Sequence, residues 1–586
     1  MNNRQIAEIF ESIADLSEMK GQQRYTIVAY QKVARTIGQW PVELEQMVHD
    51  KEDLKEIPGV GDAIAKKIEQ LVTTGKMESY EKLRAEFPDG MLNVIRVPGV
   101  GPKTAKQLWD NLGVSTVEQL GEAARDGSLA AVPRMGEKKA GAIVRALESR
   151  RVSDGQAPIA VAMPAADRAV AALREICPSI RKLEIAGNLR RYEETTERID
   201  LICVASDPSE VVEALTEMAN VAEVVGGGGT RASVILSDGV QLDLRLVKDH
   251  QFGALFQYFT GNEQHNGLLR EHAQNMGLSL SEYGITNTST NESAQFEDEA
   301  SLYERLGLQF IPPELREGNR EVDAAKEGLI PRLVETGDLK GDLHVHTDWS
   351  DGVASMVEMV EAAQSKGYEY VAITDHSSGR GIANGLTEER LRQHGAMLGR
   401  IQENTPGITL LHGSEVDIRA NGTIDYPDEV LQELDWVVAS VHSAMDQDST
   451  VMTERIVRAM RNPHVHAIGH LSTRLIGERK LISADFEAIF EAAAQTGTVL
   501  EINASPERLD LKDSHVSMAR ELGVVLAIDS DAHRVETLGN QRYGVGVARR
   551  GWCEPRHILN TLPLADFMSF LRMDKSERSV LVAAHV

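Results

Sequence analysis

Seven short apolar segments alternate with helical segments between residues 341 and 533, and this alternation constrains the fold more than any other feature of the chain. The apolar segments are GDLHVHT, YVAITDHS, ITLLHGSEVD, WVVASVHS, HAIGHLS, TVLEINAS and VVLAIDSDAH. Strands that alternate with helices are typically parallel, because each helix returns the chain to the same end of the sheet. We therefore expect these strands to close toward a barrel.

Histidine and carboxylate side chains stand at the ends of six of these seven strands. They are His344, His346, Asp351, His376, Glu415, His442, His470, Asp531 and His533. The carboxyl ends of the strands in a β/α barrel face one common mouth, so these side chains are expected to converge. A single histidine at a strand end is usually a structural residue, but six occupied ends favour a metal centre. Imidazole with carboxylate suits Zn²⁺, Mn²⁺ or Fe²⁺ better than Mg²⁺ alone, and nine ligands are enough for three ions.

The first 150 residues are predicted to be helical and contain a repeated turn. The turn occurs as IPGVG at 57–61 and as VPGVG at 97–101, and a weaker third copy at 132–136 is interpreted as packing. Glycines at such a turn let backbone N–H groups at a helix N-terminus approach a phosphate closely. Such contacts hold the DNA backbone without reading the base sequence. We expect the first two copies to bind DNA through Gly59, Gly61, Gly99 and Gly101.

The charge of the chain is unevenly distributed. The net charge of −27 argues against nucleic acid at first sight, because phosphate contacts need cations. Residues 1–150, however, hold 21 Lys and Arg against 22 Asp and Glu, so the acidity lies downstream and DNA is not excluded. Three widely separated cysteines favour a reducing cytoplasm. Without a signal peptide or a long apolar run, the chain is expected to be cytoplasmic and to make no membrane contact.

Residues 159–318 are predicted to mix helices with strands. The expected helices are 165–176 and 208–218, and the expected strands are 182–186, 199–204, 232–236 and 240–246. The segment RVSDGQAP at 151–158 is interpreted as a linker, and residues 319–338 as another connection. The chain is therefore predicted to contain several domains, as its length of 586 residues also requires.

The barrel segment resembles the polymerase and histidinol phosphatase (PHP) domain over about residues 340–575. The motifs that carry this resemblance are DLHVHTDWSDG, AITDHS, GSEVDI, ASVHS, IGH and DSDAH. The resemblance implies a distorted (β/α)7 barrel at 339–586 with three ions, Mn²⁺ or Zn²⁺. One ion would be held by His344, His346, Glu415 and Asp531, and Glu415 would bridge to a second held by His442 and His470. The third would be held by Asp351, His376 and His533, and together the ions would promote attack on a phosphate ester.

Residues 1–318 resemble a family X DNA polymerase. The segments that carry this resemblance are GNLRRYEETTERIDLI, LDLRLV, YFTGNEQHN and SEYGI. The resemblance implies a helical, 8-kDa-like DNA-binding domain at 1–90 and a helix-hairpin-helix, fingers-type domain at 91–158. An α+β nucleotidyltransferase palm with its C-terminal subdomain would follow at 159–318. Positions implied to contact nucleotide or template are Gly187, Arg191, Tyr258, Asn266 and Arg270. Lys67 matches the lysine that attacks an abasic sugar, although the neighbouring basic position is here Ala63.

The palm departs from the family pattern at its metal site. Family members carry Asp-x-Asp on one strand and a third Asp on the next, and two Mg²⁺ ions need all three carboxylates. This chain keeps Asp200 and Asp243 but has Arg198 in the first position, and Asn188 replaces a serine at the nucleotide turn. Because strand residues two apart share a face, we expect Arg198 to lie between the two aspartates. Mg²⁺ binding and polymerisation in the palm are therefore predicted to be impaired.

Three functions remain open from the sequence. The first is a DNA repair protein whose barrel is a 3′-to-5′ exonuclease acting on gapped, 3′-ended or abasic DNA. The second is an active gap-filling polymerase with an accessory nuclease, which would also bind nucleotide. The third is a phosphatase of small phosphomonoesters. Tethered DNA-binding hairpins favour the first over the third, and a monomer is expected in each case. Arg474, Arg508 and Asn503 follow metal-ligand positions and are either phosphate contacts or ordinary polar loop residues.

Overall fold

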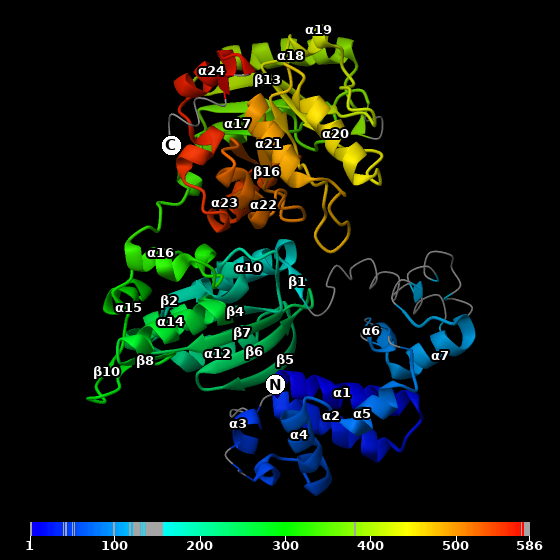
Figure 1. Ribbon diagram of the computed structural model, residues 1–586, viewed down its shortest axis with the longest axis vertical. Helices are drawn as coiled ribbons and strands as arrows, with labels where there is room; N and C mark the ends of the chain where they lie inside the picture. Colours follow the sequence, from blue (N-terminus) through cyan, green and yellow to red (C-terminus); the bar gives the residue numbers. More distant parts are fainter. Residues whose placement is uncertain are drawn as a thin grey trace. The chain divides into compact units, whose positions relative to one another are not determined.

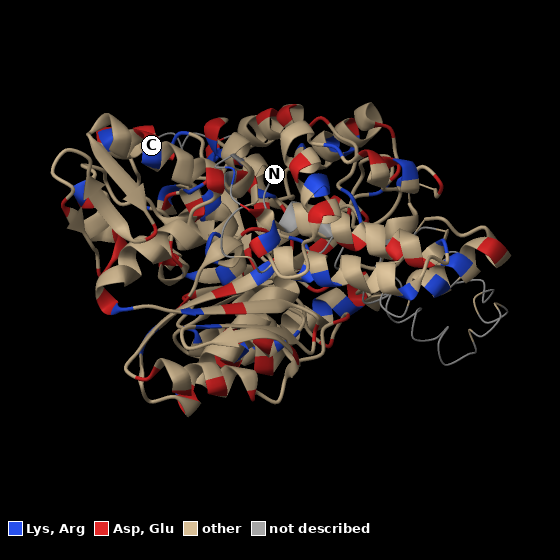
Figure 2. Ribbon diagram, turned by 90° about the horizontal axis from the view of Figure 1, so that it is seen from below, with Lys and Arg blue, Asp and Glu red and all other residues tan. Residues whose placement is uncertain are grey.

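The computed structural model describes residues 3–38, 40, 44–49, 51, 53–88, 90–95, 97, 100–116, 119–120, 123, 129, 132, 135, 156–379, 383–575 and 577–578. The chain divides into two compact units, Met1–Val152 and Ser153–Val586 (Figure 1). Basic and acidic residues are interspersed along the helices (Figure 2). No helix in the described part of the chain is long and apolar enough to span a lipid bilayer.

Every helix or strand described in the first unit is a helix, and turns or irregular segments join these helices. Its elements are α1 (Asn3–Met19), α2 (Arg24–Gly38), α3 (Leu44–His49), η1 (Leu54–Glu56), α4 (Asp62–Thr74), α5 (Glu78–Arg84), α6 (Met91–Ile95) and α7 (Pro102–Leu112). Apolar residues three and four apart, such as Ile6, Phe10 and Ile13 of α1, are buried in one core. The predicted helical character is confirmed for these residues. Gly99 and most of the third turn copy lie outside the described residues.

The second unit begins with a five-stranded palm sheet in the order β2-β4-β7-β6-β5. Its elements are α10 (Ile159–Ile176), β2 (Ile180–Ile185), α11 (Gly187–Arg190), β4 (Arg198–Ala205), α12 (Pro208–Thr216), β5 (Val221–Gly228), β6 (Arg231–Leu236) and β7 (Gln241–Leu246). A short pair, β1 (Ala157–Pro158) and β3 (Thr195–Thr196), lies beside it. Strands β4 and β7 are parallel, whereas the other pairs are antiparallel. The four predicted palm strands are present within two residues of their expected ends.

Two features of the palm differ from expectation. Strand β5 was not predicted, because nearly all of its residues are exposed and glycines from Gly226 replace the alternating apolar pattern of a half-buried strand. Helix α10 begins at Ile159 instead of at residue 165, with Pro158 at its N-cap and Pro164 inside it. Its alanine-rich face, including Ala162, Ala165 and Ala169, packs in the core that covers the sheet.

A small mixed subdomain follows the palm. It contains α13 (Asp249–Thr260), α14 (Glu263–Asn275), β8 (Leu278–Ser281), β9 (Gly284–Asn287), β10 (Ser293–Ala294), α15 (Glu299–Arg305) and η4 (Pro313–Leu315). The segment 319–338, expected to be a connection, carries α16 (Glu321–Glu327) and η5 (Thr336–Asp338). Val322, Ala325, Ile330 and Leu333 of this segment are buried in the core of the subdomain, so the connection is folded against it.

The C-terminal part is a seven-stranded parallel barrel. Its strands are β11 (Gly341–Val345), β12 (Tyr370–Ile373), β13 (Thr409–Asp417), β14 (Trp436–Ser440), β15 (Ala467–Ile468), β16 (Val499–Asn503) and β17 (Leu526–Asp529). They pair in sequence order, and a parallel bridge from Val345 to Ala532 joins the first strand to the segment after the last. Helices α17 (Met356–Ser365), α18 (Glu388–Asn404), α19 (Asp428–Leu431), α20 (Ser449–Met460), α21 (Phe486–Thr496), α22 (Asp513–Glu521), α23 (Gln541–Arg550) and α24 (Leu564–Arg572) accompany the strands. The predicted (β/α)7 architecture is confirmed.

Candidate metal centre

The strands of the barrel bring the nine predicted ligands to one mouth. His344 lies near the end of β11 and Glu415 near the end of β13, and the other ligands follow the strands or lie in the adjoining loops. Because all seven strands are parallel, these positions open on the same side. The structure thus gathers side chains that are up to 189 positions apart, from His344 to His533, into one cluster.

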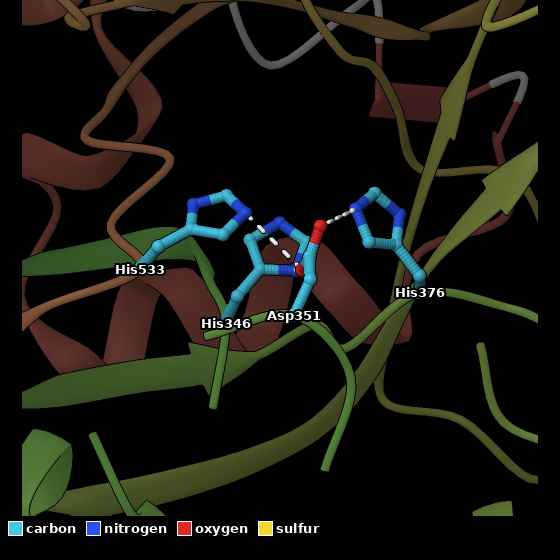
Figure 3. A group of neighbouring side chains, drawn as sticks. All are labelled: His346, Asp351, His376 and His533. Atoms are coloured by element: carbon cyan, nitrogen blue, oxygen red, sulfur yellow. Dashed lines mark ion pairs between the residues drawn. The ribbon is translucent and has the colours of Figure 1, made fainter. Parts of the chain in front are cut away.

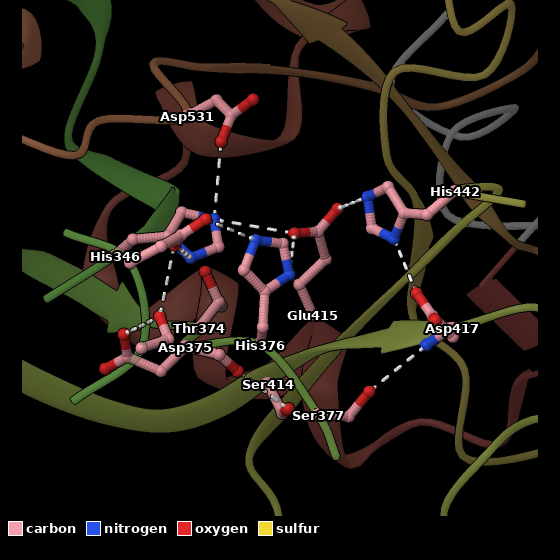
Figure 4. Close-up of polar contacts among 12 residues, drawn as sticks. His346, Thr374, Asp375, His376, Ser377, Ser414, Glu415, Asp417, His442 and Asp531 are labelled. Carbon is pink, nitrogen blue, oxygen red and sulfur yellow. Dashed lines mark hydrogen bonds and ion pairs between the residues drawn. The ribbon is translucent and has the colours of Figure 1, made fainter. Parts of the chain in front are cut away.

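The carboxylate of Glu415 lies at the centre of this cluster and is only 1% exposed (Figure 4). Five imidazoles place a nitrogen within 3.5 Å of its oxygens, those of His344, His346, His376, His442 and His470. The closest is Nδ1 of His376, at 2.9 Å from Oε2, and Nε2 of His470 lies 3.0 Å from Oε1. One carboxylate therefore has both oxygens directed at separate groups of imidazoles, which is the arrangement of a bridging ligand.

A second group of ligands lies toward the solvent. Asp351 places Oδ1 at 3.2 Å from Nε2 of His533 and Oδ2 at 3.3 Å from Nε2 of His376 (Figure 3). His346 completes a set whose ligand atoms all lie within 4.8 Å of one another. Two further sets meet the same criterion, His344 with His346 and Asp531, and His376 with Glu415 and His442. The geometry thus provides three overlapping sets of ligand atoms.

The chemistry of these side chains fits divalent cations. Nε2 of His344 and both ring nitrogens of His346 are buried and make no hydrogen bond to any described residue, although carboxylate oxygens lie 3.3 to 3.8 Å away. Burial, together with the neighbouring His533 and His376, lowers the pKa of His346 to about 4. That imidazole is therefore neutral near pH 7 and can offer a lone pair to a metal. Buried nitrogens that face carboxylates without bonding to them are what a bound ion would satisfy.

Three carboxylates behind the ligands were not predicted, of which Asp375 and Glu501 are buried and Asp417 is partly exposed. Asp375 accepts hydrogen bonds from the backbone N–H and the hydroxyl of Thr347, at 2.8 and 2.6 Å, in the loop that carries Asp351. Asp417 lies 2.5 Å from Nδ1 of His442, and Glu501 lies 2.6 Å from Nδ1 of His344. The sequence did contain a signal, since each is a charged residue within or beside an otherwise apolar strand.

The three polar residues beside the mouth, Arg474, Asn503 and Arg508, have different surroundings. Arg474 places Nη1 at 2.7 Å from Glu194 of the palm, and its Nη2 donates to the Leu509 carbonyl. Asn503 is fully buried and donates to Oδ2 of Asp531 at 3.0 Å. Arg508 is partly exposed, with Nε at 4.0 Å from the same Asp531 oxygen. Arg474 and Asn503 are therefore bonded within the protein, and Arg508 remains the candidate phosphate contact.

The palm holds an arginine where the resemblance implies metal. Asp200 and Asp243 are direct partners in the parallel β4–β7 pair. Nε of Arg198 lies 2.9 Å from Oδ1 of Asp200 and 3.5 Å from Oδ2 of Asp243, so its predicted position between the aspartates is confirmed. Ser233 and Gln241 also donate to Asp243, at 2.6 and 2.8 Å. Burial opposes the charge of Arg198, but Asp200 and Asp243 outweigh it and raise the pKa of Arg198. The site is a closed network of paired charges.

The nucleotide turn of the palm is bonded within the protein. Gly187 adopts φ +67°, and a Cβ there would lie 2.9 Å from Oδ2 of Asp200, so the turn requires glycine. Arg191 is buried, donating to the Thr260 carbonyl at 2.6 Å and to Glu317 at 3.1 Å. Its remaining nitrogen donates to Asn188 at 3.1 Å.

The other positions implied to contact nucleotide or template lie on α13 and α14. Asn266 is buried and donates to the Tyr258 carbonyl at 2.8 Å, while its own oxygen accepts from Gln257. The Tyr258 ring lies edge-on to Phe259 and is partly exposed. Arg270 is partly exposed on α14. Of this group, Tyr258 and Arg270 therefore have side chains accessible to a ligand.

Arginines at the end of helix α23 link the barrel to the palm and to the subdomain that follows the palm. Arg549 lies 2.7 Å from Glu314, and Arg550 lies 2.7 Å from Glu317 and 3.2 Å from Glu193. Arg550 is largely buried, so these bonds are shielded from solvent. The loop that follows the nucleotide turn is thereby fixed on the barrel.

The turn copies of the first unit place glycines at helix N-termini. Gly61 is the N-cap of α4 and Gly101 the N-cap of α7, and a Cβ at either position would meet no atom within 4 Å. Gly59 has φ +95°, which requires glycine. Lys67 lies on α4, where its amino group donates to the Tyr30 hydroxyl and lies 4.8 Å from the centre of that ring.

Four known domain families match the chain. They are a helix-hairpin-helix domain at residues 1–77, a SAM-like helix-hairpin-helix tandem at 91–149, the DNA polymerase beta thumb at 255–317 and the PHP domain at 342–505. The thumb match includes the second half of α13 and all of α14. The PHP match runs from the second residue of β11 past the end of β16.

Individual relatives match either the whole chain or its barrel. The DNA polymerase/3′-5′ exonuclease PolX of Bacillus subtilis (strain 168) is 38% identical over 574 residues, which cover 98% of this chain and 100% of the relative. Two proteins named probable phosphatase, from Thermoanaerobacter sp. (strain X514) and Caldicellulosiruptor bescii, are each 29% identical. These alignments cover 38% and 40% of this chain and 89% and 96% of the relatives. The chain therefore belongs to the family X DNA polymerases that carry a C-terminal PHP domain.

Proposed function

We propose that the barrel is a metal-dependent 3′-to-5′ exonuclease that acts on DNA in repair. The single observation that carries this proposal is the convergence of nine histidine and carboxylate ligands on one mouth, arranged around Glu415. The name of the Bacillus subtilis relative supports this direction of cleavage. The proposed site takes a phosphodiester at the 3′ end of a strand, and gapped or abasic DNA would supply such ends.

The proposed metal ligands are the nine predicted residues, with Glu415 as the bridge between two ions. Mn²⁺ or Zn²⁺ suits this mixture of imidazole and carboxylate. Ions held there would lower the pKa of water and withdraw charge from the phosphate oxygens. The protein's own part is to hold the ligands in place, to exclude bulk water from the buried side of the site and to offer Arg508 to the phosphate.

DNA would be captured by the hairpins of the first unit. Gly61 and Gly101 leave open space in front of the N-termini of α4 and α7, which supports close approach of a phosphate to the backbone amides. The resemblance also supports a lyase role for Lys67, which borohydride trapping of an abasic-DNA adduct would test. The three cysteines are free, which supports action in a reducing cytoplasm, and a monomer is proposed.

The palm is proposed to be a structural and DNA-holding part without polymerase activity. Arg198 pairs with the two carboxylates that remain of the metal site, and Arg191 is bonded to Glu317 and Thr260. Two Mg²⁺ ions need three carboxylates and no resident cation, so Mg²⁺ binding there is proposed to be absent or weak. The alternative is an active gap-filling polymerase, which is supported by the retained Asp200 and Asp243 and by the name of the Bacillus subtilis relative.

A second alternative is a phosphatase of small phosphomonoesters, supported by the names of the relatives that match the barrel alone. One assay separates the three functions. The purified chain with Mn²⁺ is given 5′-labelled gapped, 3′-recessed and abasic DNA, with and without nucleotides, and separately p-nitrophenyl phosphate. We expect stepwise shortening from the 3′ end. Nucleotide-dependent lengthening would favour the polymerase, and hydrolysis of p-nitrophenyl phosphate without any DNA cleavage would favour the phosphatase.

A further inference from the structure

Strand β16 supplies none of the nine predicted ligands, yet it points two polar side chains into the mouth of the barrel. Glu501 and Asn503 lie two residues apart and therefore share a face of the strand. Both are buried, with Glu501 1% exposed and Asn503 fully enclosed. A buried carboxylate is costly unless donors surround it, so its partners identify its role.

Glu501 contacts ligands that come from two other strands. Its Oε1 lies 2.6 Å from Nδ1 of His344, and its Oε2 accepts the backbone N–H of His470 at 2.5 Å. Asn503 donates to the same Oε2 at 3.2 Å and to Oδ2 of Asp531 at 3.0 Å. The orientation of the Asn503 amide is fixed, because its oxygen accepts the backbone N–H of Ser505 at 3.1 Å.

From these contacts we propose that Glu501, with Asn503, is the positioning frame of the metal centre, holding His344, His470 and Asp531 and setting the tautomer of His344. This inference rests on the proposed metal centre but assigns a role to residues outside the ligand set. With Nδ1–H donated to Glu501, the lone pair of His344 is on Nε2, the atom that faces Glu415 and Asp531 at 3.5 and 3.7 Å. A carboxylate behind a histidine ligand fixes the ring and raises its basicity.

The contacts of Glu501 make an amide a damaging replacement. The backbone N–H of His470 can only donate, so the single oxygen of a glutamine at position 501 would turn toward it. The NH₂ group would then face Nδ1 of His344, which would have to become an acceptor. The ring proton would move to Nε2 and point into the site, where it would block metal binding.

Asp417 provides a matched comparison. It lies 2.5 Å from Nδ1 of His442 and stands behind a histidine ligand in the same way. Among the described residues, which leave out 380–382, no second hydrogen-bond donor reaches its carboxylate side chain. An asparagine there could turn its oxygen toward His442 and keep the tautomer. Glu501→Gln and Asp417→Asn both replace a carboxylate by an amide. Only the first is expected to move the ring proton of a histidine ligand to the nitrogen that faces the metal.

The experiment measures Mn²⁺ binding to the full chain by calorimetry, and bound Mn²⁺ after dialysis by elemental analysis. Glu501→Gln is expected to weaken binding about 10- to 100-fold, the range typical of such supporting partners, and to lose the same equivalent of metal as His344→Ala. Asp417→Asn is expected to weaken binding clearly less than Glu501→Gln does, because it keeps its hydrogen bond and the tautomer of His442. The thermal midpoint of the metal-free Glu501→Gln protein is expected to match that of wild type.

Wild-type Mn²⁺ affinity and stoichiometry in Glu501→Gln would overturn the proposal, as would a lowered metal-free midpoint with unchanged Mn²⁺ binding. If Glu501→Gln does not fold, Asn503→Ala tests the same frame, because it removes the donor to Asp531 and leaves the Glu501–His344 contact. Unchanged Mn²⁺ affinity in Asn503→Ala would then overturn it. A wild-type chain that binds neither Mn²⁺ nor Zn²⁺ would instead overturn the proposed metal centre, and a nuclease-inactive chain that binds Mn²⁺ would contradict only the proposed function.

Discussion

The barrel mouth and the palm site both gather carboxylates from a sheet with parallel strands, but they balance the negative charge in opposite ways. In the barrel, imidazoles surround Glu415, and an imidazole that gives up its proton offers a lone pair to an exchangeable cation. In the palm, Arg198 is itself the cation and is bonded to Asp200 and Asp243. A guanidinium cannot be released or deprotonated, so Arg198 is a permanent cation between the two aspartates. The comparison shows how one substitution can turn a metal site into a structural network.

The largest expected effect is the loss of exonuclease activity when ligands are removed from the barrel mouth. Replacing both His344 and His346 by alanine removes ligands from two of the three ligand sets. Loss of a metal removes several kcal/mol of transition-state stabilisation, so exonuclease activity is expected to fall by about 1000-fold or more. DNA affinity, measured by fluorescence anisotropy, is expected to stay near wild type, because the hairpins lie in the other unit.

His250→Ala is the control for this double variant, because His250 is an exposed histidine of the palm region. It is expected to leave exonuclease activity unchanged. Circular dichroism in EDTA is the measurement that checks whether the double variant is folded. Full exonuclease activity in a folded double variant would show that the nuclease does not use this mouth.

A smaller effect tests how DNA reaches the barrel. Gly61→Leu and Gly101→Leu add side chains before α4 and α7, at positions where a Cβ meets no atom within 4 Å. Each obstructs charge-assisted hydrogen bonds to a phosphate, worth about 1.5 kcal/mol or more, so DNA affinity is expected to fall about 10-fold. Affinity should also decrease with salt and not depend on sequence.

The matched control is Gly399→Leu on α18 of the barrel, where a Cβ also meets nothing within 4 Å. It is expected to leave DNA affinity unchanged. Equal affinities for wild type and the two hairpin variants, or a preference for one DNA sequence, would contradict capture by these turns.

The smallest effect tests the palm network. Arg198→Ala leaves Asp200 and Asp243 without their shared cation, and burial already raises the pKa of Asp200. Removing one partner of a fully buried pair costs about 3–5 kcal/mol. Because the Arg198 side chain is 36% exposed, solvent screening reduces the expected loss in free energy of unfolding to about 1 kcal/mol. Urea unfolding of the chain in EDTA measures this loss.

Arg168→Ala is the control for the palm variant. Arg168 pairs with Asp238 at 3.3 Å on the surface and is 61% exposed, so its loss should cost less than about 0.5 kcal/mol. An Arg198→Ala chain as stable as this control would show that the arginine does not hold the aspartates together.

Much of the barrel could be predicted from the sequence, because its signals are local. Strand periodicity and ligand residues at strand ends identify the nine side chains without knowledge of distant contacts. The period of two along a strand likewise placed Arg198 beside Asp200. Glu501 was not identified, because its role depends on His344, which lies 157 positions earlier in the chain. Only the closed barrel brings the two together.

The predictions that missed an element or stayed untested also have physical reasons. Strand β5 carries no apolar alternation, because its residues from Ala222 on are exposed and three glycines end it. The likeness of Arg191 to a nucleotide contact rests on its neighbours in sequence. Its bonds to Thr260, the last residue of α13, and to Glu317, which follows η4, form only in the folded protein. The identity of the bound metal ion and of the substrate does not follow from the positions of the side chains alone.

The barrel is expected to remove nucleotides from DNA, and the palm is expected not to add them. The most direct test is one 5′-labelled primer–template with Mn²⁺ and all four nucleotides, given to wild type and to the His344→Ala/His346→Ala double variant. Wild type is expected to shorten the primer from its 3′ end. The double variant is expected to leave the primer at its original length, because Arg198 occupies the palm site. Template-directed extension by the double variant would contradict the account.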